Sequence, residues 1–495
     1  MATAMDFTPI AIAAVGCGLL LREFDVAALR IPVLDYLEAR RFSLLDQLIG
    51  AVPIPDEPKG CIRLKGPIGA EDAVVWTEGG PPMIITGELD AGVHEFTDLE
   101  THGTSASTSP RGTLWAIDRL SEPTPRLTAL EVPLPADVST LHTHGLGLHG
   151  DVLFAVNHAF QGGGERIERW RITRGAEPDG PPLVLMHLGS VTGHGGDEVG
   201  EGAWSFTSML NAAINDLAPV GINEFYMTQF LDAPASLEGA GSGTLEEYVS
   251  PPEGRLAASY RWAAARLGIE IHAKTLLPRL RRSRIWHCYC ASGDTGSDCA
   301  RTACEPVGPP GACWNGITSR PLAPGEQPPA PGARGILFVN DIFRRIVVEF
   351  AIVGEGARAS LKQLRQFRAP FLVDNVHLDA SGEALWVGAV GVSHQSFWGG
   401  LDALRANASA AHTAATAAGN PTPRPHLHLR PSEDSPPQPP MPSGALHIDL
   451  ASGKVSAKLV QRRQLAAISW SHGVGDRIFM GSPWDDGVLV CPRDP

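Results

Sequence analysis

Short motifs that would identify a familiar enzyme mechanism are absent from this chain of 495 residues. There is no Gly-x-Ser-x-Gly sequence, so the exposed nucleophilic serine of many hydrolases is not indicated. There is also no Gly-x-x-x-x-Gly-Lys phosphate-binding loop and no His-Glu-x-x-His zinc motif. Chemistry must therefore be sought in residues dispersed along the chain.

Basic residues are outnumbered, since 40 Lys and Arg face 54 Asp and Glu, giving a formal net charge of -14. This balance argues against nucleic acid as a partner and is compatible with cation binding. Ignoring the N-terminus, no segment is long and apolar enough to span a bilayer.

The N-terminus carries one apolar run, Phe7–Leu21, which is shorter than the about 20 residues of a membrane span. It resembles the apolar part of a signal peptide or signal anchor, although a basic segment before it and a clear cleavage site after it are missing. The alternative is a buried helix. We expect residues 1–30 to form a hydrophobic signal or anchor helix that directs the chain to secretion or membrane anchoring and provides membrane or lipid association.

Glycine and proline are abundant, with 54 and 42 residues, which favours a turn-rich β-fold. A turn residue followed by a short apolar strand with an aromatic residue recurs along the chain, and such repeated sheet units predict an all-β, six-bladed β-propeller. A two-sheet sandwich is the alternative. The six copies are Asp72–Thr77, Asp151–Asn157, Asn223–Thr228, Gly335–Asn340, Glu383–Gly388 and Asp476–Gly481.

The spacing of the copies is uneven, and two predicted insertions account for it. Residues 233–282 include a segment of helical periodicity, Arg255–Arg282, and residues 400–442 are rich in Ala and then in Pro. The second insertion contains the sequon at Asn407, which matters only in a secreted chain. The propeller domain is thus expected over residues 31–495.

Five of the eight cysteines cluster between Cys288 and Cys313. Their spacing lacks the paired C-x₂-C units of zinc ribbons, so local disulfides are favoured over a metal site. Because five is odd, one of them should stay free or pair elsewhere. This usage agrees with an oxidising compartment.

Four dispersed sites carry oxygen-bearing side chains at the ends of apolar runs, and such ligands suit a hard cation such as Ca²⁺. Neighbouring side chains of an extended chain point in opposite directions, so each dipeptide can serve two ions. Glu71, Asn215, Asn315, Asp374 and Asn375 would then form one site, and Asp72 and Asp216 another.

Two histidines are candidates for acid–base chemistry. His144 and His158 both lie in apolar, strand-like segments. A histidine near a metal-bound ester can serve as a general base toward water, and a second one can orient it. A hydrogen-bonded structural role is the alternative for each, and His142 has no assigned role.

In order along the chain, several motifs resemble those of the serum paraoxonase/arylesterase family. They are Gly69-Ala-Glu-Asp72, Thr143-His-Gly-Leu146, Val156-Asn-His158, Ile214-Asn-Asp-Leu-Ala-Pro-Val220, Trp314-Asn-Gly-Ile317, Leu372-Val-Asp-Asn-Val376 and Gly487-Val-Leu-Val-Cys491. The resemblance runs from about residue 58 to the end, excluding the insertions. It implies a six-bladed propeller with two Ca²⁺ ions in its central tunnel.

The same resemblance assigns roles. It places the first set of five residues at a catalytic ion, and Asp72, Asp216 and the backbone carbonyl of Leu146 at a structural one. It makes His144 and His158 a water-activating dyad and pairs Cys61 with Cys491. The chain departs from the family at Gln229-Phe230, where an Asn-Asp-His run is common, and at Ala389-Val390, where a Cys-His pair is common. Both departures concern the pocket walls.

We therefore expect a Ca²⁺-dependent hydrolase of carboxylic esters, either aryl esters or lactones, acting on small molecules. The first alternative is a related propeller lactonase of the gluconolactonase or strictosidine synthase-like type. The second is a non-catalytic, calcium-stabilised propeller that binds a protein partner.

Overall fold

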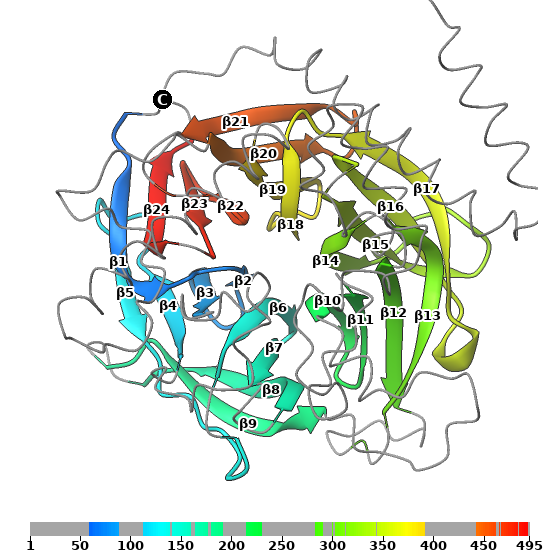
Figure 1. The fold of residues 1–495 in the computed structure, drawn as a ribbon, viewed down its shortest axis with the longest axis horizontal. Helices are drawn as coiled ribbons and strands as arrows, with labels where there is room; N and C mark the ends of the chain where they lie inside the picture. The colour runs from blue at the N-terminus through cyan, green and yellow to red at the C-terminus, as the bar shows by residue number, and fades with distance from the viewer. Residues whose placement is uncertain are drawn as a thin grey trace, which may run out of the picture.

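The computed structural model describes fifteen stretches of the chain. They are residues 59–88, 112–138, 141–159, 164–176, 180–191, 214–229, 283–290, 299, 302–311, 313–342, 344–391, 442–461, 465, 467–483 and 485–493. These stretches form six antiparallel sheets of four strands each, arranged as blades around a common axis (Figure 1). The predicted all-β, six-bladed β-propeller is confirmed.

Each blade is a meander of consecutive strands. Blade 1 contains β2 (Ala73–Trp76), β3 (Met83–Gly87), β4 (Leu114–Asp118) and β5 (Arg126–Ala129). Blade 2 contains β6 (Thr143–His149), β7 (Val152–Ala159), β8 (Gly164–Arg174) and β9 (Leu183–Val191). Blade 3 contains β10 (Ile214–Gly221), β11 (Glu224–Gln229), β12 (Ser283–Cys290) and β13 (Thr302–Gly311).

The other three blades follow the same order. Blade 4 contains β14 (Trp314–Pro321), β15 (Ala333–Asp341), β16 (Ile346–Val353) and β17 (Ser360–Arg368). Blade 5 contains β18 (Leu372–Leu378), β19 (Ala384–Gly391), β20 (Ser443–Asp449) and β21 (Val455–Gln461). Blade 6 contains β22 (Trp470–Val474), β23 (Arg477–Gly481) and β24 (Asp486–Pro492), with β1 (Ile62–Ile68) as its outer strand.

Blade 6 closes the ring because it combines both ends of the described chain. β1 pairs antiparallel with β24, with Ile62 opposite Val490. The predicted disulfide between Cys61 and Cys491 is present beside this pairing and spans 430 residues of sequence. A crosslink over so long a loop belongs at the upper end of the usual range of about 0–5 kcal/mol.

The repeats found in the sequence mark the second strand in five of the six blades. These strands are β7, β11, β15, β19 and β23. They read as apolar runs because neighbouring blades cover both of their faces, and every residue of β19 is buried. The first copy is the exception, since it falls on the innermost strand β2. The second strand of that blade, β3, has no aromatic residue and so escaped the pattern.

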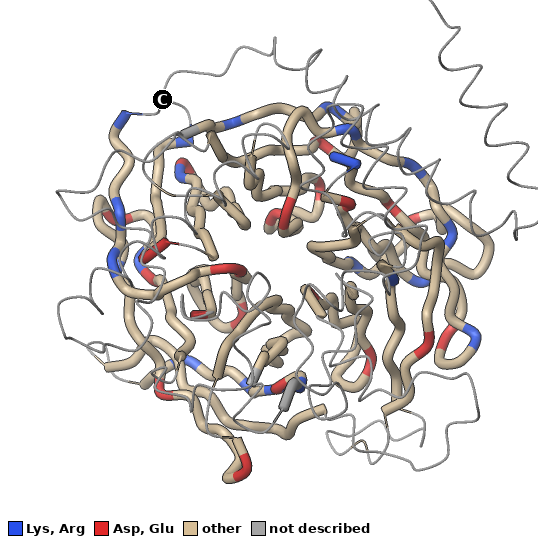
Figure 2. The backbone as a smooth tube through the Cα atoms, viewed as in Figure 1, with Lys and Arg blue, Asp and Glu red and all other residues tan. Residues whose placement is uncertain are grey.

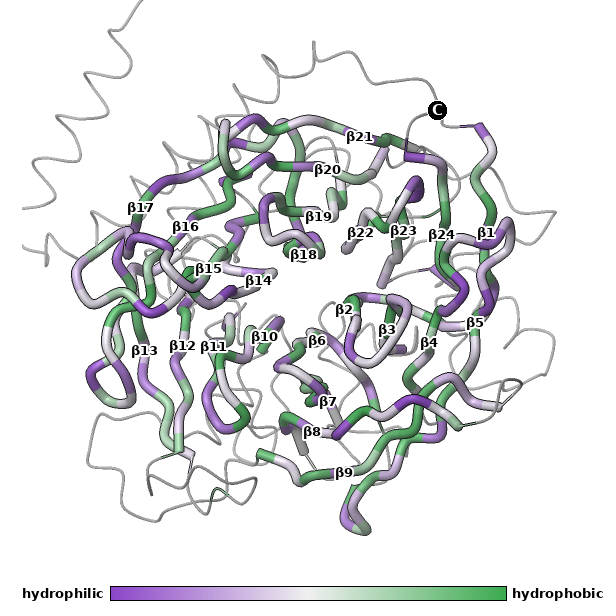
Figure 3. The backbone as a smooth tube through the Cα atoms, turned by 180° about the vertical axis from the view of Figure 1, so that it is seen from behind, coloured by the Kyte–Doolittle hydropathy of each residue, from purple (hydrophilic) through white to green (hydrophobic). Residues whose placement is uncertain are grey.

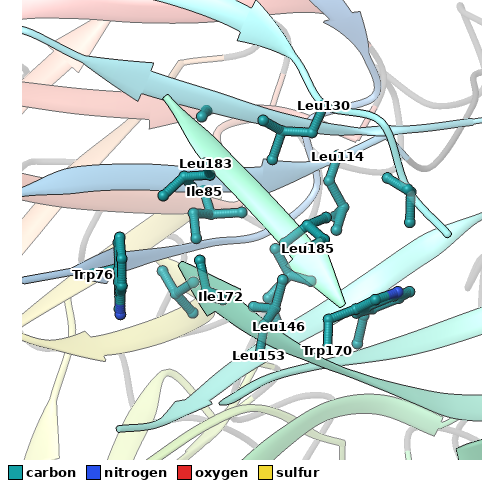
Figure 4. Packing of buried hydrophobic residues seen from close by; sticks show 14 of the residues in the cluster. Trp76, Ile85, Leu114, Leu130, Leu146, Leu153, Trp170, Ile172, Leu183 and Leu185 are labelled. Atoms are coloured by element: carbon teal, nitrogen blue, oxygen red, sulfur yellow. The ribbon is translucent and has the colours of Figure 1, made fainter. Parts of the chain in front are cut away.

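Apolar side chains fill the spaces between blades. Between blades 1 and 2, Trp76 and Ile85 pack with Leu146, Leu153 and Trp170 in one buried cluster (Figure 4). The outer strand β17 is more polar, which is visible when the propeller is seen from behind (Figure 3). Burial between blades thus fixes the innermost strands, which carry the candidate site.

Several expectations concern residues outside the described stretches. These are the helix over residues 1–30, nearly all of both insertions (233–282 and 400–442) and the sequon at Asn407. Within the described residues, helical structure is limited to the short 3₁₀ element η4 (Gly356–Arg358). No helix in these stretches is both long and apolar enough to cross a membrane.

The cysteine cluster forms local disulfides, as the spacing predicted. Cys288 pairs with Cys304 and Cys290 with Cys299, both across the β12–β13 hairpin of blade 3. The fifth member, Cys313, is a free and buried thiol. The cluster is therefore structural and holds no zinc knuckle.

Candidate functional site

The predicted ligands lie in, or just before, innermost strands. Glu71 and Asp72 precede β2, Asn215 and Asp216 begin β10, Asn315 lies in β14, and Asp374 and Asn375 lie in β18. These innermost strands contact one another around the ring. Figure 2 shows acidic segments beside β2 and β18 near the centre, whereas Lys and Arg lie mostly toward the rim. The fold therefore brings together residues that are some 300 positions apart in sequence, as with Glu71 and Asn375.

A break in strand register recurs where these side chains occur. In blade 2 it lies between Thr143 and Leu146, in blade 3 between Ile214 and Leu217, in blade 4 between Trp314 and Ile317, and in blade 5 between Val373 and Val376. Such bulges redirect side chains and are common near active sites. Each break contains one residue pair, and we call these the inner pairs: His144-Gly145, Asn215-Asp216, Asn315-Gly316 and Asp374-Asn375, with Glu71-Asp72 as the equivalent pair in blade 1.

The predicted catalytic set contains buried oxygen atoms without hydrogen-bond partners. All five residues of the set are buried, with at most 7% of each exposed. The unpartnered atoms are Glu71 Oε2, Asn215 Oδ1, Asn315 Oδ1 and Asn375 Oδ1. A buried polar atom without a partner is costly, so several in one cluster indicate a missing partner. A hard cation with oxygen ligands supplies such a partner, and the residues present fit Ca²⁺.

The charges of the cluster point the same way. Burial raises the pKa of Asp374 well above its usual range, and the nearby carboxylates of Glu71 and Asp72 raise it further. Burial and the charge of Asp72 likewise raise the pKa of Asp216 well above normal. Carboxylates crowded in this way repel one another unless a positive charge lies between them. A cation at the Glu71–Asp374 set would relieve the repulsion among Glu71, Asp72 and Asp374.

The amide oxygens are essential to this assignment. Among the described residues, no group of three or more His, Cys, Asp and Glu side chains is placed to hold a metal ion. The candidate set has two carboxylates, Glu71 and Asp374, and is completed by three asparagines. This composition suits a hard ion that accepts amide oxygens and disfavours zinc, which prefers nitrogen and sulfur ligands.

Glycine allows the inner pairs to approach closely. A Cβ atom at Gly316 would lie 2.5 Å from Asn375 Cα and 2.6 Å from the Asp374 carbonyl oxygen. We expect Gly316→Ala to push β14 and β18 apart, at a cost of about 1–3 kcal/mol. Calcium affinity measured by calorimetry should then fall by about 10-fold to 100-fold.

The matched control for this prediction is Gly221→Ala at the far end of β10, where a Cβ atom would make only an ordinary contact of 3.5 Å with Glu224. Wild-type affinity in Gly316→Ala would show that close packing of these strands does not shape the cation site.

The two predicted histidines form a buried pair. His144 Nδ1 lies 3.0 Å from His158 Nε2, and His144 Nε2 lies 3.4 Å from Glu71 Oε1. His144 therefore stands between the carboxylate cluster and His158. The sequence predicted this proximity through the family resemblance, and the structure places the two rings together.

Their pKa values are shifted in opposite directions. Burial acts to lower the pKa of His144, but the Glu71 carboxylate, the Ile214 backbone and Asp72 together outweigh burial and raise that pKa above its usual value. Burial, together with the neighbouring His144 and His142, holds the pKa of His158 well below normal. His158 thus stays neutral, and His144 is the member that can take up a proton.

The predicted structural set is arranged differently. Asp72 Oδ2 accepts the Leu146 N–H at 2.7 Å, and Asp216 Oδ2 accepts the Ile317 N–H at 2.8 Å. Asp216 Oδ1 also accepts the Leu217 N–H at 2.7 Å. These carboxylates join neighbouring blades, since each bonds the residue that follows the glycine of the next inner pair. Their oxygens are largely supplied with protein donors, so they fit a cation less well than the first set.

Sequence reasoning missed two groups of residues at the site. Ser469 Oγ donates to the Glu71 carbonyl at 2.6 Å, and Thr228 Oγ1 donates to the Asn315 carbonyl, so both hydroxyls position the backbone of predicted ligands. His377 and His472 form a second histidine pair, with ring centroids 4.3 Å apart. His377 could have been noticed, because it lies two residues after Asn375 and strand side chains at this spacing share a face.

The two departures from the family pattern lie on second strands. Gln229 ends β11 with a buried side chain, and its Oε1 accepts the Trp286 indole N–H at 2.8 Å. Ala389 and Val390 are buried near the end of β19.

Comparisons with known proteins return weak structural likenesses. No family model and no curated protein matches the chain. A putative 6-phosphogluconolactonase from Bacteroides fragilis is 9% identical, with a TM-score of 0.33 over 83% of this chain and 76% of that chain. The periplasmic gluconolactonase of Pseudomonas aeruginosa is 12% identical, with a TM-score of 0.34 over 85% and 89%.

A third similar structure is named as an oxidoreductase and not as a lactonase. It is a putative oxidoreductase (glucose dehydrogenase) from Thermus thermophilus, 11% identical, with a TM-score of 0.27 over 68% of this chain and 95% of that chain. The fold assignment rests on the strand order of this chain, and its chemistry has to be argued from the site.

Proposed function

We propose that the chain is a Ca²⁺-dependent hydrolase of carboxylic esters whose substrates are small aryl esters or lactones. The observation that supports this most strongly is the set of four unpartnered, buried oxygen atoms on Glu71, Asn215, Asn315 and Asn375. They lie beside the pair of His144 and His158, in which His144 Nε2 faces Glu71. A hard-cation site next to a general base is a combination suited to hydrolysis by water.

Glu71 and Asp374 would hold the ion by charge, and the three asparagine oxygens would complete the protein ligands. When bound, Ca²⁺ supplies Lewis-acid polarisation of the substrate carbonyl and stabilises the developing oxyanion. Five protein ligands leave room for substrate in a coordination number of about 6–8. Glu71 also contacts the histidine pair, because its Oε1 lies 3.4 Å from His144 Nε2.

The histidine pair would handle the proton. For His144 Nε2 to accept a proton from water, Nδ1 must carry hydrogen and donate to His158 Nε2, 3.0 Å away. His158 suits this role because its low pKa keeps it neutral and able to accept. As the water oxygen bonds to the carbonyl carbon and the ester C–O bond breaks, His144 passes the proton to the leaving-group oxygen, which becomes an alcohol. Water is the nucleophile, so no covalent enzyme intermediate is required.

A substrate panel tests this proposal. Purified protein would be assayed with phenyl acetate, aliphatic γ- and δ-lactones and sugar lactones. The assays would contain about 1 mM Ca²⁺, which is on the order of ten thousand times the Kd of the tightest calcium-sensor sites in proteins. We expect turnover of aryl esters or aliphatic lactones that EGTA abolishes and added Ca²⁺ restores. Turnover confined to sugar lactones would favour the related lactonase. Calcium binding without turnover of any substrate would favour the non-catalytic propeller.

A further inference from the structure

The second predicted calcium set has protein partners where the first set has unpartnered oxygens. Both carboxylate oxygens of Asp216 accept backbone N–H groups, from Leu217 and Ile317. Asp72 Oδ2 accepts the Leu146 N–H. Of the four carboxylate oxygens of Asp72 and Asp216, only Asp72 Oδ1 lacks a hydrogen-bond donor in good alignment.

The free side of Asp72 is faced by a histidine. His377 Nε2 lies 3.1 Å from Asp72 Oδ1, and the His377 side chain is 7% exposed. Neither atom has another hydrogen-bond partner. Each is thus available to the other, and a small rotation of the imidazole would align the N–H with the carboxylate.

Neighbouring aromatic rings keep His377 in this position. Its ring packs against His472, with centroids 4.3 Å apart. His472 is anchored in turn, because its Nε2 lies 2.9 Å from the Ala73 carbonyl oxygen and its ring packs near Trp470. The Trp470 indole N–H donates to the Ala70 carbonyl at 2.8 Å. Blade 6 therefore fixes the imidazole beside the strand segment that carries Asp72.

The geometry around Asp72 conflicts with an ion at the same place. Ca²⁺ needs six to eight oxygens at about 2.3–2.6 Å, and it approaches a carboxylate along directions that a nearby imidazole blocks. A histidine nitrogen is also a poor ligand for this hard cation. With Asp216 engaged by two N–H donors, little of the second set remains for metal binding.

We infer that His377 replaces the second predicted ion, so that this chain holds one Ca²⁺. Hydrogen bonds from protein donors to Asp72 and Asp216 then join blade 1 to blade 2 and blade 3 to blade 4. The inference uses the proposed function only for the first ion. Its own content is the difference in bound calcium between the wild type and a variant without the imidazole.

The experiment counts calcium per chain by mass spectrometry of the intact full-length protein under native conditions, with elemental analysis as a second measure. We expect one ion in the wild type and two in His377→Ala, where the imidazole no longer covers Asp72. His377→Gln keeps a donor near Asp72 and should hold one ion. His149→Ala, at the exposed end of β6, is the control and should also hold one.

Two ions in the wild type would overturn the inference, and so would equal counts in the wild type and a folded His377→Ala. If His377→Ala fails to fold, the wild-type count alone decides, with one ion supporting the inference and two overturning it. A wild type without calcium would instead overturn the proposed function. The gain of one ion in His377→Ala would still support the replacement, so the two failures are distinguishable.

Discussion

Asp374→Asn should lower kcat/KM by about 10³-fold while making the metal-free protein more stable. The substitution keeps the shape of the side chain but removes one carboxylate charge from the cluster that contains Glu71 and Asp72. Burial and those neighbours raise the pKa of Asp374 well above normal, so its ionised form is disfavoured without a cation. Removing the charge therefore relieves repulsion in the metal-free state and weakens calcium binding.

The expected results have opposite signs in the two conditions. With EGTA near pH 8, thermal unfolding of Asp374→Asn should occur a few degrees above that of the wild type. With saturating Ca²⁺ the order should reverse. The value of kcat/KM should fall by about 10³-fold, because Lewis-acid polarisation is worth several kcal/mol and each 1.36 kcal/mol is tenfold in rate.

The pH dependence follows from the same shift. A carboxyl group whose pKa is raised in the folded state binds more protons there than in the unfolded state, so stability falls as pH rises through the folded pKa. Metal-free wild type should lose stability from above pH 3.8 upward through that raised value, and Asp374→Asn should lose less. Asp476→Asn, at a residue whose side chain is 90% exposed, is the matched control. Unchanged activity in Asp374→Asn would refute the role given to this carboxylate.

His144→Gln should lower kcat by about 10²–10⁴ without a large change in calcium affinity. The glutamine side chain can keep a hydrogen bond to His158 but cannot act as a base near neutral pH. Calcium affinity should stay within about threefold because His144 is not a ligand of the proposed site. Stopped-flow or steady-state hydrolysis and calcium calorimetry measure the two quantities separately.

The pH profile distinguishes a base from a structural residue. His144 must be neutral to accept a proton, so activity should rise with pH through its pKa. In the metal-free protein Glu71 raises that pKa above 6.5 against the effect of burial, and Ca²⁺ on Glu71 would lower it, so the acid limb of the calcium-bound enzyme should lie below the metal-free pKa. This limb should disappear in His144→Gln. His149→Gln, on the same strand β6, serves as the control, and full activity in His144→Gln would exclude the proton role.

The fold was predictable because the second strand of most blades carries the same pattern. Runs such as Gly335–Asn340 and Glu383–Gly388 are covered on both faces, so they must be apolar, and this leaves a visible repeat. Blade 1 was misplaced by one strand because β3, Met83–Gly87, has no aromatic residue. The sequence thus predicted the number of blades better than the position of each strand within its blade.

The proximity of the first set of candidate ligands was also predictable, since side-chain chemistry and motif order both pointed to Glu71, Asn215 and Asp374. What the sequence could not show is how the inner pairs interlock. The bulges at Asp374-Asn375 and its equivalents, and the bond from Asp72 to the Leu146 N–H, depend on neighbouring blades. The contact between His377 and Asp72 likewise joins residues some 300 positions apart, on strands whose packing only the folded ring defines.

The most direct test of the central claim is a calcium titration of chelator-treated protein in which ion binding and hydrolysis of a responsive ester or lactone are recorded in parallel. The account predicts that activity returns along the same isotherm as binding of the first ion, and that Asp374→Asn shows neither response in that concentration range. Full hydrolysis before any calcium is added, or occupancy of the Glu71–Asp374 site without hydrolysis of any ester or lactone, would contradict it.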